Sequence, residues 1–433
     1  MKSVRLWSAL LCGMCWIVGD RVQAQVLKNH TKPEVFFMRT RGAEIDSAVV
    51  DEVIGAYYST LEKGFRETGL PRFIVAGREG KMLFGVGGNV SVRLNYDFEG
   101  MVPDLDFVTS DIPVPGSPRT RRQVLFDPST SGLYFKAIAH AGRLGPIVGY
   151  VQTDFRGGTN HRSLGLQMAY VEIAGFCVGR RFTTFCDLGA SPATVDFEGP
   201  NGYPLVYRTM VRYGHRFGEH WSVAVAAEMP DPSVSYVPGT SAVAQRMPDF
   251  PLYVRYGWNE DKSHLRLSAI FRDIYFFEDG RNEVNDLFGW GVQFSGAIQI
   301  GPRLKTYMQY LYGEGIAAYI QDIAGEGLDL ATDPHRTGAL QALPAMSWIG
   351  GLQYAFSPKW VATAAYSGVK VSGRNDYRVP DTYRIAHYVS ANLFYHLTGS
   401  CQIGAAYLYG TRRNMDDRQG HANRAQAIVQ YSF

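Results

Sequence analysis

From residue 82 to the C-terminus, apolar and polar residues alternate with a period of two. Between residues 84 and 98 the even positions are Phe, Val, Gly, Val, Val, Leu, Tyr and Phe, and the odd positions are Gly, Gly, Asn, Ser, Arg, Asn and Asp. The same alternation returns over 287–300. Because strands of soluble proteins are usually about 5–6 residues long, alternation over this length favours strands that cross a bilayer at a tilt.

Sixteen segments of this kind follow one another along the chain. They cover 82–98, 131–140, 145–155, 162–174, 175–185, 203–217, 219–229, 250–258, 262–278, 287–300, 301–313, 345–357, 359–371, 382–397, 400–413 and 421–433. Short turns alternate with mostly long connections, as in outer-membrane barrels, where the short turns are periplasmic. A backbone in lipid must also satisfy its own hydrogen bonds. We therefore predict an all-β fold, a closed sixteen-stranded antiparallel transmembrane β-barrel over 82–433.

The two ends of the chain carry export and assembly features. Residues 1–24 combine basic Lys2 and Arg5, an apolar run over 6–18 and small residues before Gln25, which predicts a signal peptide. The terminal Phe433 follows alternating apolar residues, as in the assembly signal of Gram-negative outer-membrane barrels. We expect the Gram-negative outer membrane as the location, with outer-membrane lipid and, during biogenesis, the barrel-assembly machinery as partners.

The segment 25–81 differs from the barrel. Apolar residues recur there at helical spacing within 46–67, namely at Val50, Ile54, Tyr57, Leu61 and Phe65. This short helical segment could form a trimeric coiled coil in the periplasm, or it could fold into the lumen as a plug. We favour the periplasmic, oligomerising interpretation.

Composition and motifs exclude several other classes. The chain holds 26 Tyr, 24 Phe and 7 Trp, too many for a disordered protein, and its formal net charge of only +3 argues against nucleic acid as a partner. No serine-hydrolase elbow, zinc-protease motif or phosphate-binding loop is present. The mature cysteines have no metal-ligand spacing. No enzyme activity, metal or cofactor is therefore implied.

Arginine is the informative charged residue, with 33 Arg against 10 Lys. Because an unpaired Arg in lipid would cost roughly 2–4 kcal/mol near the midplane, arginines on the polar face of the strands should point into the lumen. The predicted pore-lining residues are Arg93, Arg181, Arg208, Arg212, Arg255, Arg266, Arg272 and Arg303. Each could instead be neutralised by a nearby carboxylate. As a group along a water-filled path, they would suit small anions such as dicarboxylates.

The connection 186–202 joins the fifth and sixth predicted strands. In sixteen-stranded porins this connection folds inward and narrows the pore. Here it carries Asp187, Asp196 and Glu198. We predict a constriction loop whose acidic groups face wall arginines and set a transverse field across the pore.

Three stretches resemble the DcaP-type trimeric outer-membrane porins. They are Gly179 to Phe185, Ser191 to Pro200, and Phe107 to Pro113 upstream. The resemblance covers most of 80–433 and is most specific from Val195 to Pro200. It implies a homotrimer of sixteen-stranded barrels, an N-terminal periplasmic oligomerising segment, and uptake of small anionic solutes such as dicarboxylates.

These patterns together predict a passive, substrate-biased porin. One alternative is a barrel enzyme such as a lipase, which would need a Ser–His–acid arrangement on the outer wall. Another is an adhesin or structural barrel with a filled lumen, whose long loops 99–130 and 314–344 would bind partners. The small Gly, Ser and Asn residues on the inner face of 84–98 favour the open lumen of a porin.

Overall fold

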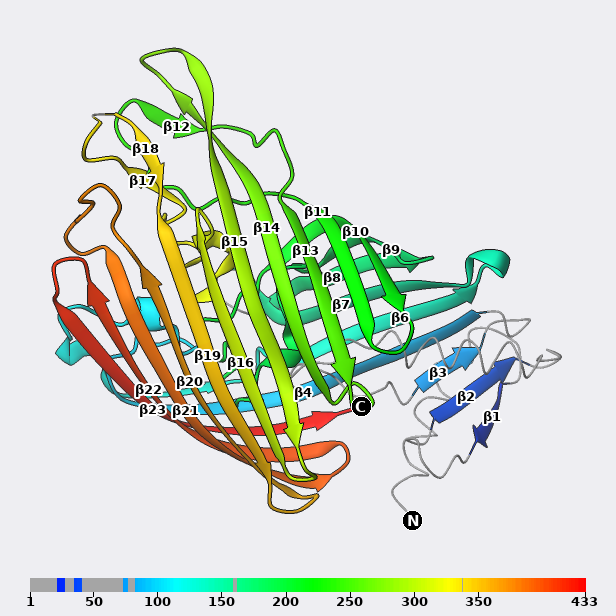
Figure 1. Cartoon of the computed structure of the whole chain (residues 1–433). Coiled ribbons are helices and arrows are strands. Elements are labelled where there is room, and N and C mark those ends of the chain that lie inside the picture. Colours follow the sequence, from blue (N-terminus) through cyan, green and yellow to red (C-terminus); the bar gives the residue numbers. More distant parts are fainter. Residues whose placement is uncertain (1–21, 28–34, 41–72, 77–81, 159–161, 337) are drawn as a thin grey trace.

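The computed structural model describes residues 22–27, 35–40, 73–76 and 82–433, apart from 159–161 and 337. Its main body is a closed β-barrel (Figure 1). The barrel strands are β4 (Met82–Glu99), β6 (Gly132–His140), β7 (Pro146–Gly157), β8 (Ser163–Ile173), β9 (Phe176–Phe182), β10 (Tyr207–Phe217), β11 (Trp221–Glu228), β13 (Phe250–Trp258), β14 (Ser263–Glu278), β15 (Glu283–Ile300), β16 (Leu304–Glu314), β19 (Pro344–Ala355), β20 (Trp360–Val371), β21 (Tyr383–Thr398), β22 (Cys401–Asn414) and β23 (Gln419–Ser432).

The sixteen-stranded antiparallel barrel is confirmed. Each of these strands pairs with the next along the chain, and β23 closes the barrel against β4 with Ser432 opposite Asn89. Phe433 extends this closing seam, because its N–H and C=O both bond to the backbone of Gly88, at 2.9 and 3.0 Å. Closure leaves no free sheet edge in lipid, as a membrane barrel requires.

Several short elements were not predicted. β5 (Arg121–Asp127) pairs with the upper half of β4, whose lower half pairs with β6, so the two short strands share one position in the wall. β12 (Thr240–Ala242) extends the wall beside β14, and β17 (Leu330–Thr332) pairs with β18 (Leu340–Ala342) inside the long loop after β16. The 3-10 helices are η2 (Thr109–Asp111), η3 (Pro118–Thr120), η4 (Gly142–Leu144), η5 (Leu188–Ala190), η6 (Ala317–Tyr319) and η7 (Gln321–Ile323).

The N-terminal part adds three short strands, β1 (Val22–Leu27), β2 (Val35–Thr40) and β3 (Phe73–Ala76). β1 pairs with β2, β2 with β3, and β3 with the first residues of β4. The predicted helical stripe at 46–67 lies outside the described residues, as does the predicted signal peptide apart from 22–24. Both therefore stay predictions.

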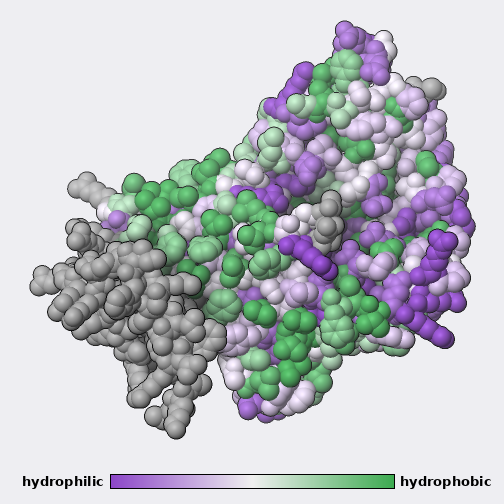
Figure 2. Space-filling model, turned by 180° about the vertical axis from the view of Figure 1, so that it is seen from behind, coloured by the Kyte–Doolittle hydropathy of each residue, from purple (hydrophilic) through white to green (hydrophobic). Residues whose placement is uncertain are grey.

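The outer wall is apolar and carries packed aromatic side chains beside the short turns. Beside the short turns, Trp221 packs on Tyr256 at 4.9 Å between ring centroids, and Trp360 packs on Tyr395 at 4.6 Å. Aromatic side chains of this kind gather at membrane–water interfaces. Figure 2 shows hydrophobic side chains gathered on the wall and hydrophilic ones toward the end that carries the long loops. Among the described residues, no helix is both long and apolar enough to cross a bilayer.

Three long loops, those after β4, β9 and β16, fold into the mouth of the barrel and form its core. Ile316, Tyr319 and Ile323 from the loop after β16 are completely buried against Phe185 and Val369. Met101, Phe107 and Ile112 from the loop after β4 pack against Tyr388 and Leu408 of the wall. The loops that an adhesin would expose for binding are therefore largely internal.

Candidate functional site

The loop between β9 and β10 runs inside the barrel. Glu228 at the end of β11 accepts hydrogen bonds from Thr183 Oγ1 (2.7 Å) and Thr184 N (2.6 Å). Arg266 of β14 donates to the carbonyl of Cys186 at 2.7 Å and to that of Thr184. These inward side chains satisfy a backbone that has no strand partner, so the loop begins pressed against the wall.

The loop then follows the wall from β14 to β4. Its carbonyls and amides bond to inward side chains at 2.6–3.0 Å, in the pairs Gln309–Ala190, Thr363–Ala193, Asn392–Val195 and Arg93–Val195. All four wall side chains come from different strands. Residues 186–202 therefore lie within the barrel.

Two of the predicted constriction carboxylates are buried in this seam, which corrects their expected role. Asp187 bonds to His264 Nε2 (2.9 Å) and Ser295 Oγ (2.6 Å). Burial alone would raise the pKa of Asp187, but His264, Arg266 and Ser295 hold it well below its usual range. Asp196 accepts a hydrogen bond from Tyr388 at 3.0 Å. Burial and, after it, the charge of Asp106 raise the pKa of Asp196 to about 6. Both residues anchor the loop, and Asp196 also lines the larger of the two lumen cavities described below. Glu198 is half-buried.

Most predicted pore-lining arginines also need correction. Arg208, Arg266 and Arg272 lie beneath the inward loops, and all four buried arginines, with Arg93, are at most 9% exposed. The reason is the same in each case, since a folded loop inside a barrel needs donors for its carbonyls and charges for its carboxylates. Arg208, for example, bonds to Ala318 O and Asp231, both at 3.1 Å. Arg93 nevertheless lines the larger of the two lumen cavities described below, as predicted for a pore-lining residue.

The remaining four arginines occupy different positions. Arg181 pairs with Glu172 at 2.6 Å, and Arg255 pairs with Asp261 at 3.1 Å. Arg303 is exposed in the short turn before β16 rather than on a strand. Arg212 is half-buried and donates to Tyr253 Oη at 3.0 Å. No continuous arginine ladder along an open path is present in the described part of the chain.

A basic patch nevertheless lies on the inner wall, formed by Lys136, Arg181, Arg212 and Arg266. Arg212 and Arg266 both stand over the ring of Tyr253, at 5.9 and 3.9 Å from its centroid. Glu172, paired with Arg181, is the carboxylate of this region. Low-dielectric walls focus the field of such charges into the lumen. Lys136 and Glu172 escaped the sequence analysis because each is a single charged residue within an apolar strand.

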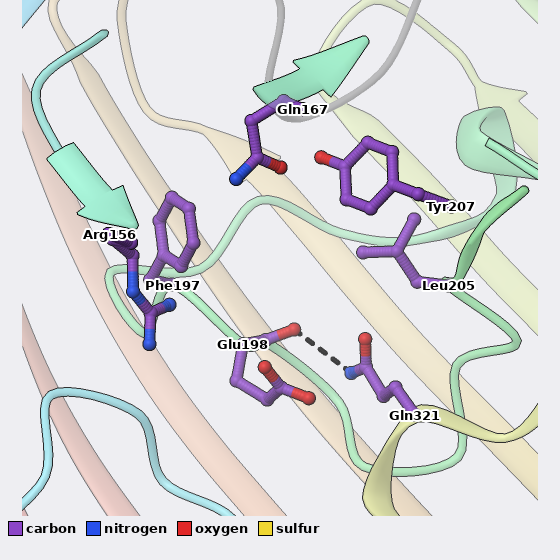
Figure 3. Close-up of a pocket in the computed structure, with 7 residues that line it drawn as sticks. All are labelled: Arg156, Gln167, Phe197, Glu198, Leu205, Tyr207 and Gln321. Carbon is purple, nitrogen blue, oxygen red and sulfur yellow. Dashed lines mark hydrogen bonds between the residues drawn. The ribbon is translucent and has the colours of Figure 1, made fainter. Parts of the chain in front are cut away.

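Two cavities mark the open part of the lumen. One, of about 220 Å³, is lined by Arg156, Gln167, Phe197, Glu198, Leu205, Tyr207 and Gln321 (Figure 3). The other, of about 300 Å³, reaches toward the short turns and includes Asn89, His396 and Gln430. Both are lined by Gln167, Phe197 and Tyr207. The two cavities therefore adjoin at these three side chains, which we name the narrow ring.

Each side chain of the narrow ring packs on, or hydrogen-bonds to, a neighbouring side chain. Phe197 lies between two guanidinium groups, those of Arg93 and Arg156, at 5.2 and 5.0 Å from its ring centroid. Gln167 Nε2 donates to Asp154 at 2.6 Å, and Tyr207 stacks on Phe182 at 4.5 Å. Gln321 fixes the next turn of the loop by bonding to the carbonyls of residues 198 and 200. Arg156 was not among the predicted site residues, because it directly follows the predicted strand 145–155; it pairs with Asp106 at 2.6 Å.

A closed sixteen-stranded barrel with an inward loop and a divided lumen is the architecture of a porin. The chain belongs to the DcaP outer membrane protein family, whose model matches residues 72–320. It is accordingly an outer-membrane protein, and the strands cross the Gram-negative outer membrane. None of the curated proteins matches the chain.

Solved structures share this fold. The outer membrane channel DcaP of Acinetobacter baumannii is 20% identical, with a TM-score of 0.72 over 81% of this chain and 97% of that one. OmpT of Vibrio cholerae is 12% identical with a TM-score of 0.53, covering 82% and 98%. An anion-selective porin from Comamonas acidovorans is 9% identical with a TM-score of 0.52, covering 81% and 100%. At these identities the likeness concerns the fold.

Proposed function

We propose that this protein is a passive porin through which small, preferentially anionic solutes diffuse. The observation that carries this proposal is the pair of cavities that meet at the narrow ring inside a closed barrel. Such a path requires no energy source, and its walls partly replace the hydration of the solute. A channel also accounts for the inward loops better than a barrel enzyme or an adhesin, for which the described residues offer no comparable feature.

The charges around the lumen support a preference for anions. The basic patch carries four cations against Glu172, and Arg156 lines the smaller cavity together with Glu198. Guanidinium groups recognise carboxylates with a matching geometry, so small dicarboxylates are the solutes we propose. The anion-selective porin from Comamonas acidovorans shows that the shared fold accommodates this selectivity.

We further propose a homotrimer. On the outer wall of β4 to β9, small Ala137, Gly149 and Ala169 form the floor of an apolar hollow of about 460 Å³ between larger residues such as Phe135 and Val178. Small residues on an outer face allow two walls to approach closely. OmpT of Vibrio cholerae, which shares the fold, has a trimer form.

The proposed function is tested in a planar bilayer. We expect conductance to appear in groups of three equal steps, and the reversal potential across a salt gradient to show a preference for anions. Arg212→Gln, which removes the half-buried cation of the basic patch, should lower the anion-to-cation permeability ratio by about half. Exposed Arg281, in the loop between β14 and β15, provides the matched Arg281→Gln control. A correctly folded barrel without conductance would contradict the porin, and an unchanged ratio would contradict the role of the patch.

The narrow ring makes a separate prediction. Phe197→Ala should raise single-channel conductance about twofold, because it removes one of the three side chains that line both cavities. Phe155, exposed on the lipid side of β7, is the control position, and Phe155→Ala should leave conductance unchanged. Equal conductance of the wild type and Phe197→Ala would place the narrowest point elsewhere.

A further inference from the structure

The outer wall of β19 to β22 carries two cations near the end formed by the long loops. Lys370 lies between Val369 and Val371, which are completely buried in the interior, so alternation turns Lys370 outward. Lys370 is half-buried there. Arg413 also points outward and is exposed, since its neighbour Arg412 reaches inward to Ser110 O. These two cations therefore face the membrane side of the wall, at its upper rim (β20 and β22 in Figure 1).

The strand register places the two cations in one row. Lys370 of β20 lies opposite Ile385 of β21, and Ile385 lies opposite Arg413 of β22. Neighbouring strands are about 4.8 Å apart, so the two backbones are about 10 Å apart with only the apolar Ile385 between them. This spacing lets two long basic side chains converge on one phosphate or reach two phosphates of one headgroup.

An aromatic surface lies directly below this row. A Cβ on Gly368 would come within 2.3 Å of the Trp348 ring, so the indole of Trp348 lies across the glycine of the neighbouring strand. His387 continues the surface, 5.9 Å from Trp348, and stacks on Tyr366 at 6.0 Å with an angle of only 9° between the rings. Tyr366 Oη and His387 Nδ1 lie 3.0 Å apart, which fixes both rings. The missing side chain at Gly368 thus makes room for an outward-facing cluster of aromatic rings, in which Trp348 is tilted by 59° to His387. We call this cluster the aromatic platform.

The height of the row matches the outer headgroups. Lys370 lies ten residues along β20 from Trp360, which marks the interface at the short turns. At about 3.3 Å per residue and a tilt of about 40°, this distance spans about 25 Å, the height of the apolar band of such barrels. The cations therefore stand at the level of lipid headgroups in the outer leaflet, with the aromatic platform just below.

The charges of this row have no partner of opposite sign within the described chain. Neither Lys370 nor Arg413 forms an ion pair with a described carboxylate, and Arg413 donates only to the amide oxygen of Gln419, at 3.1 Å. Nearby Arg384 and Arg418, in contrast, are paired with aspartates of the loops. Two cations without a carboxylate partner among the described residues, at the level of the headgroups, are complementary to lipid phosphate.

We propose that Lys370, Arg413 and the platform of Trp348, Tyr366 and His387 form a binding site for a phosphorylated glycolipid of the outer leaflet. The cations bind the phosphate groups, and the sugar rings of the headgroup lie on the aromatic platform. The acyl chains then run down the apolar wall toward Trp360. This site faces lipid rather than the lumen and does not depend on the transport proposal.

The experiment uses the full-length folded protein in detergent, titrated with diphosphorylated lipid A and with the same lipid after removal of both phosphates. Binding is read by native mass spectrometry and by the shift in unfolding temperature. The phosphorylated lipid should bind more tightly, and the double variant Lys370→Gln/Arg413→Gln should weaken its binding tenfold to about thirtyfold, taking about 1 kcal/mol per basic residue near a charged surface. Arg303→Gln/Lys359→Gln removes the same residue types, both exposed, at the opposite end of the barrel.

The outcomes separate the parts of the proposal. Equal binding of the two lipids, or equal weakening by both double variants, would overturn the site. Trp348→Leu removes the centre of the platform from an outward position and should weaken binding of phosphorylated lipid A while binding of a phospholipid such as phosphatidylglycerol stays unchanged. If Trp348→Leu leaves lipid A binding unchanged, the row binds phosphate without recognising sugar, and the glycolipid assignment is wrong.

Discussion

Replacement of Arg272 by alanine is expected to destabilise the folded protein by about 3–5 kcal/mol, the cost of leaving buried charges without their partner. The Arg272 side chain is completely buried between Asp249 (3.1 Å) and Asp329 (3.0 Å), and it also donates to the carbonyl of Gly315 at 2.7 Å. Without it, two carboxylates in the loop core would face each other with no cation. The measurement is the free energy of unfolding in detergent, from the denaturant dependence of the heat-modifiable gel shift.

Compensating variants distinguish charge from packing at this site. Asp329 also accepts hydrogen bonds from Ser233 N and Ala318 N, and Asp249 accepts one from Tyr319, so asparagine can replace both aspartates with an acceptor still in place. Asparagine at position 329 keeps only one of the two acceptor oxygens that Ser233 N and Ala318 N use. Adding Asp249→Asn and Asp329→Asn to Arg272→Ala should therefore recover part of the lost stability. If the triple variant is as unstable as Arg272→Ala, the loss comes from the volume of the side chain rather than from unpaired charge.

The strands of the barrel were predictable because lipid imposes a simple pattern. One face of each strand must be apolar over the full span, which made β4 and β15 recognisable from their sequences. β5 was missed because only Val124 and Phe126 of its seven residues are strongly exposed apolar side chains. In addition, its partner is the upper half of β4, and β4 also pairs with β6. Pairing of one strand with two others is decided by the fold, not by local alternation.

The interior was only partly predictable, for a different reason. Alternation shows which arginines point away from lipid, but it does not show whether a loop covers them. Arg93 reaches Val195, 102 residues away, and Thr109 reaches Asp322, 213 residues away. Contacts at such separations carry no local signal in one sequence. Most of the expected arginine ladder was therefore replaced by a loop scaffold, with Phe197 at the narrow ring and Arg156 packed on its ring.

Asp322 links the inward loops, and the pH dependence of stability should reveal it. Its carboxylate, 3% exposed, accepts hydrogen bonds from Thr109 N (2.8 Å), Thr109 Oγ1 (2.8 Å), Ser110 N (3.1 Å) and Tyr383 Oη (2.9 Å). Asn201 of the third loop bonds to the same threonine at 2.8 Å. Burial raises the pKa of Asp322 from 3.8 to about 6, and the hydrogen bonds offset this only in part.

The raised pKa of Asp322 determines how the stability of the protein changes with pH. Because the pKa is higher in the folded than in the unfolded protein, the contribution of Asp322 to stability is complete below pH 3.8 and is lost as the pH rises through about 6. The loss is about 3 kcal/mol at most, from about 1.4 kcal/mol per pKa unit.

Asp322→Asn keeps the acceptor for Thr109 and Ser110 and carries no charge. It should match the wild type near pH 4 and exceed its unfolding free energy near pH 8, whereas Asp322→Ala, which leaves buried donors unpaired, should be less stable at both pH values. Other titrating groups such as Asp196 contribute equally to the unfolding free energies of the wild type and Asp322→Asn, so their contributions cancel in the difference between the two proteins. If this difference in unfolding free energy stays constant from pH 4 to pH 8, Asp322 does not titrate in this range.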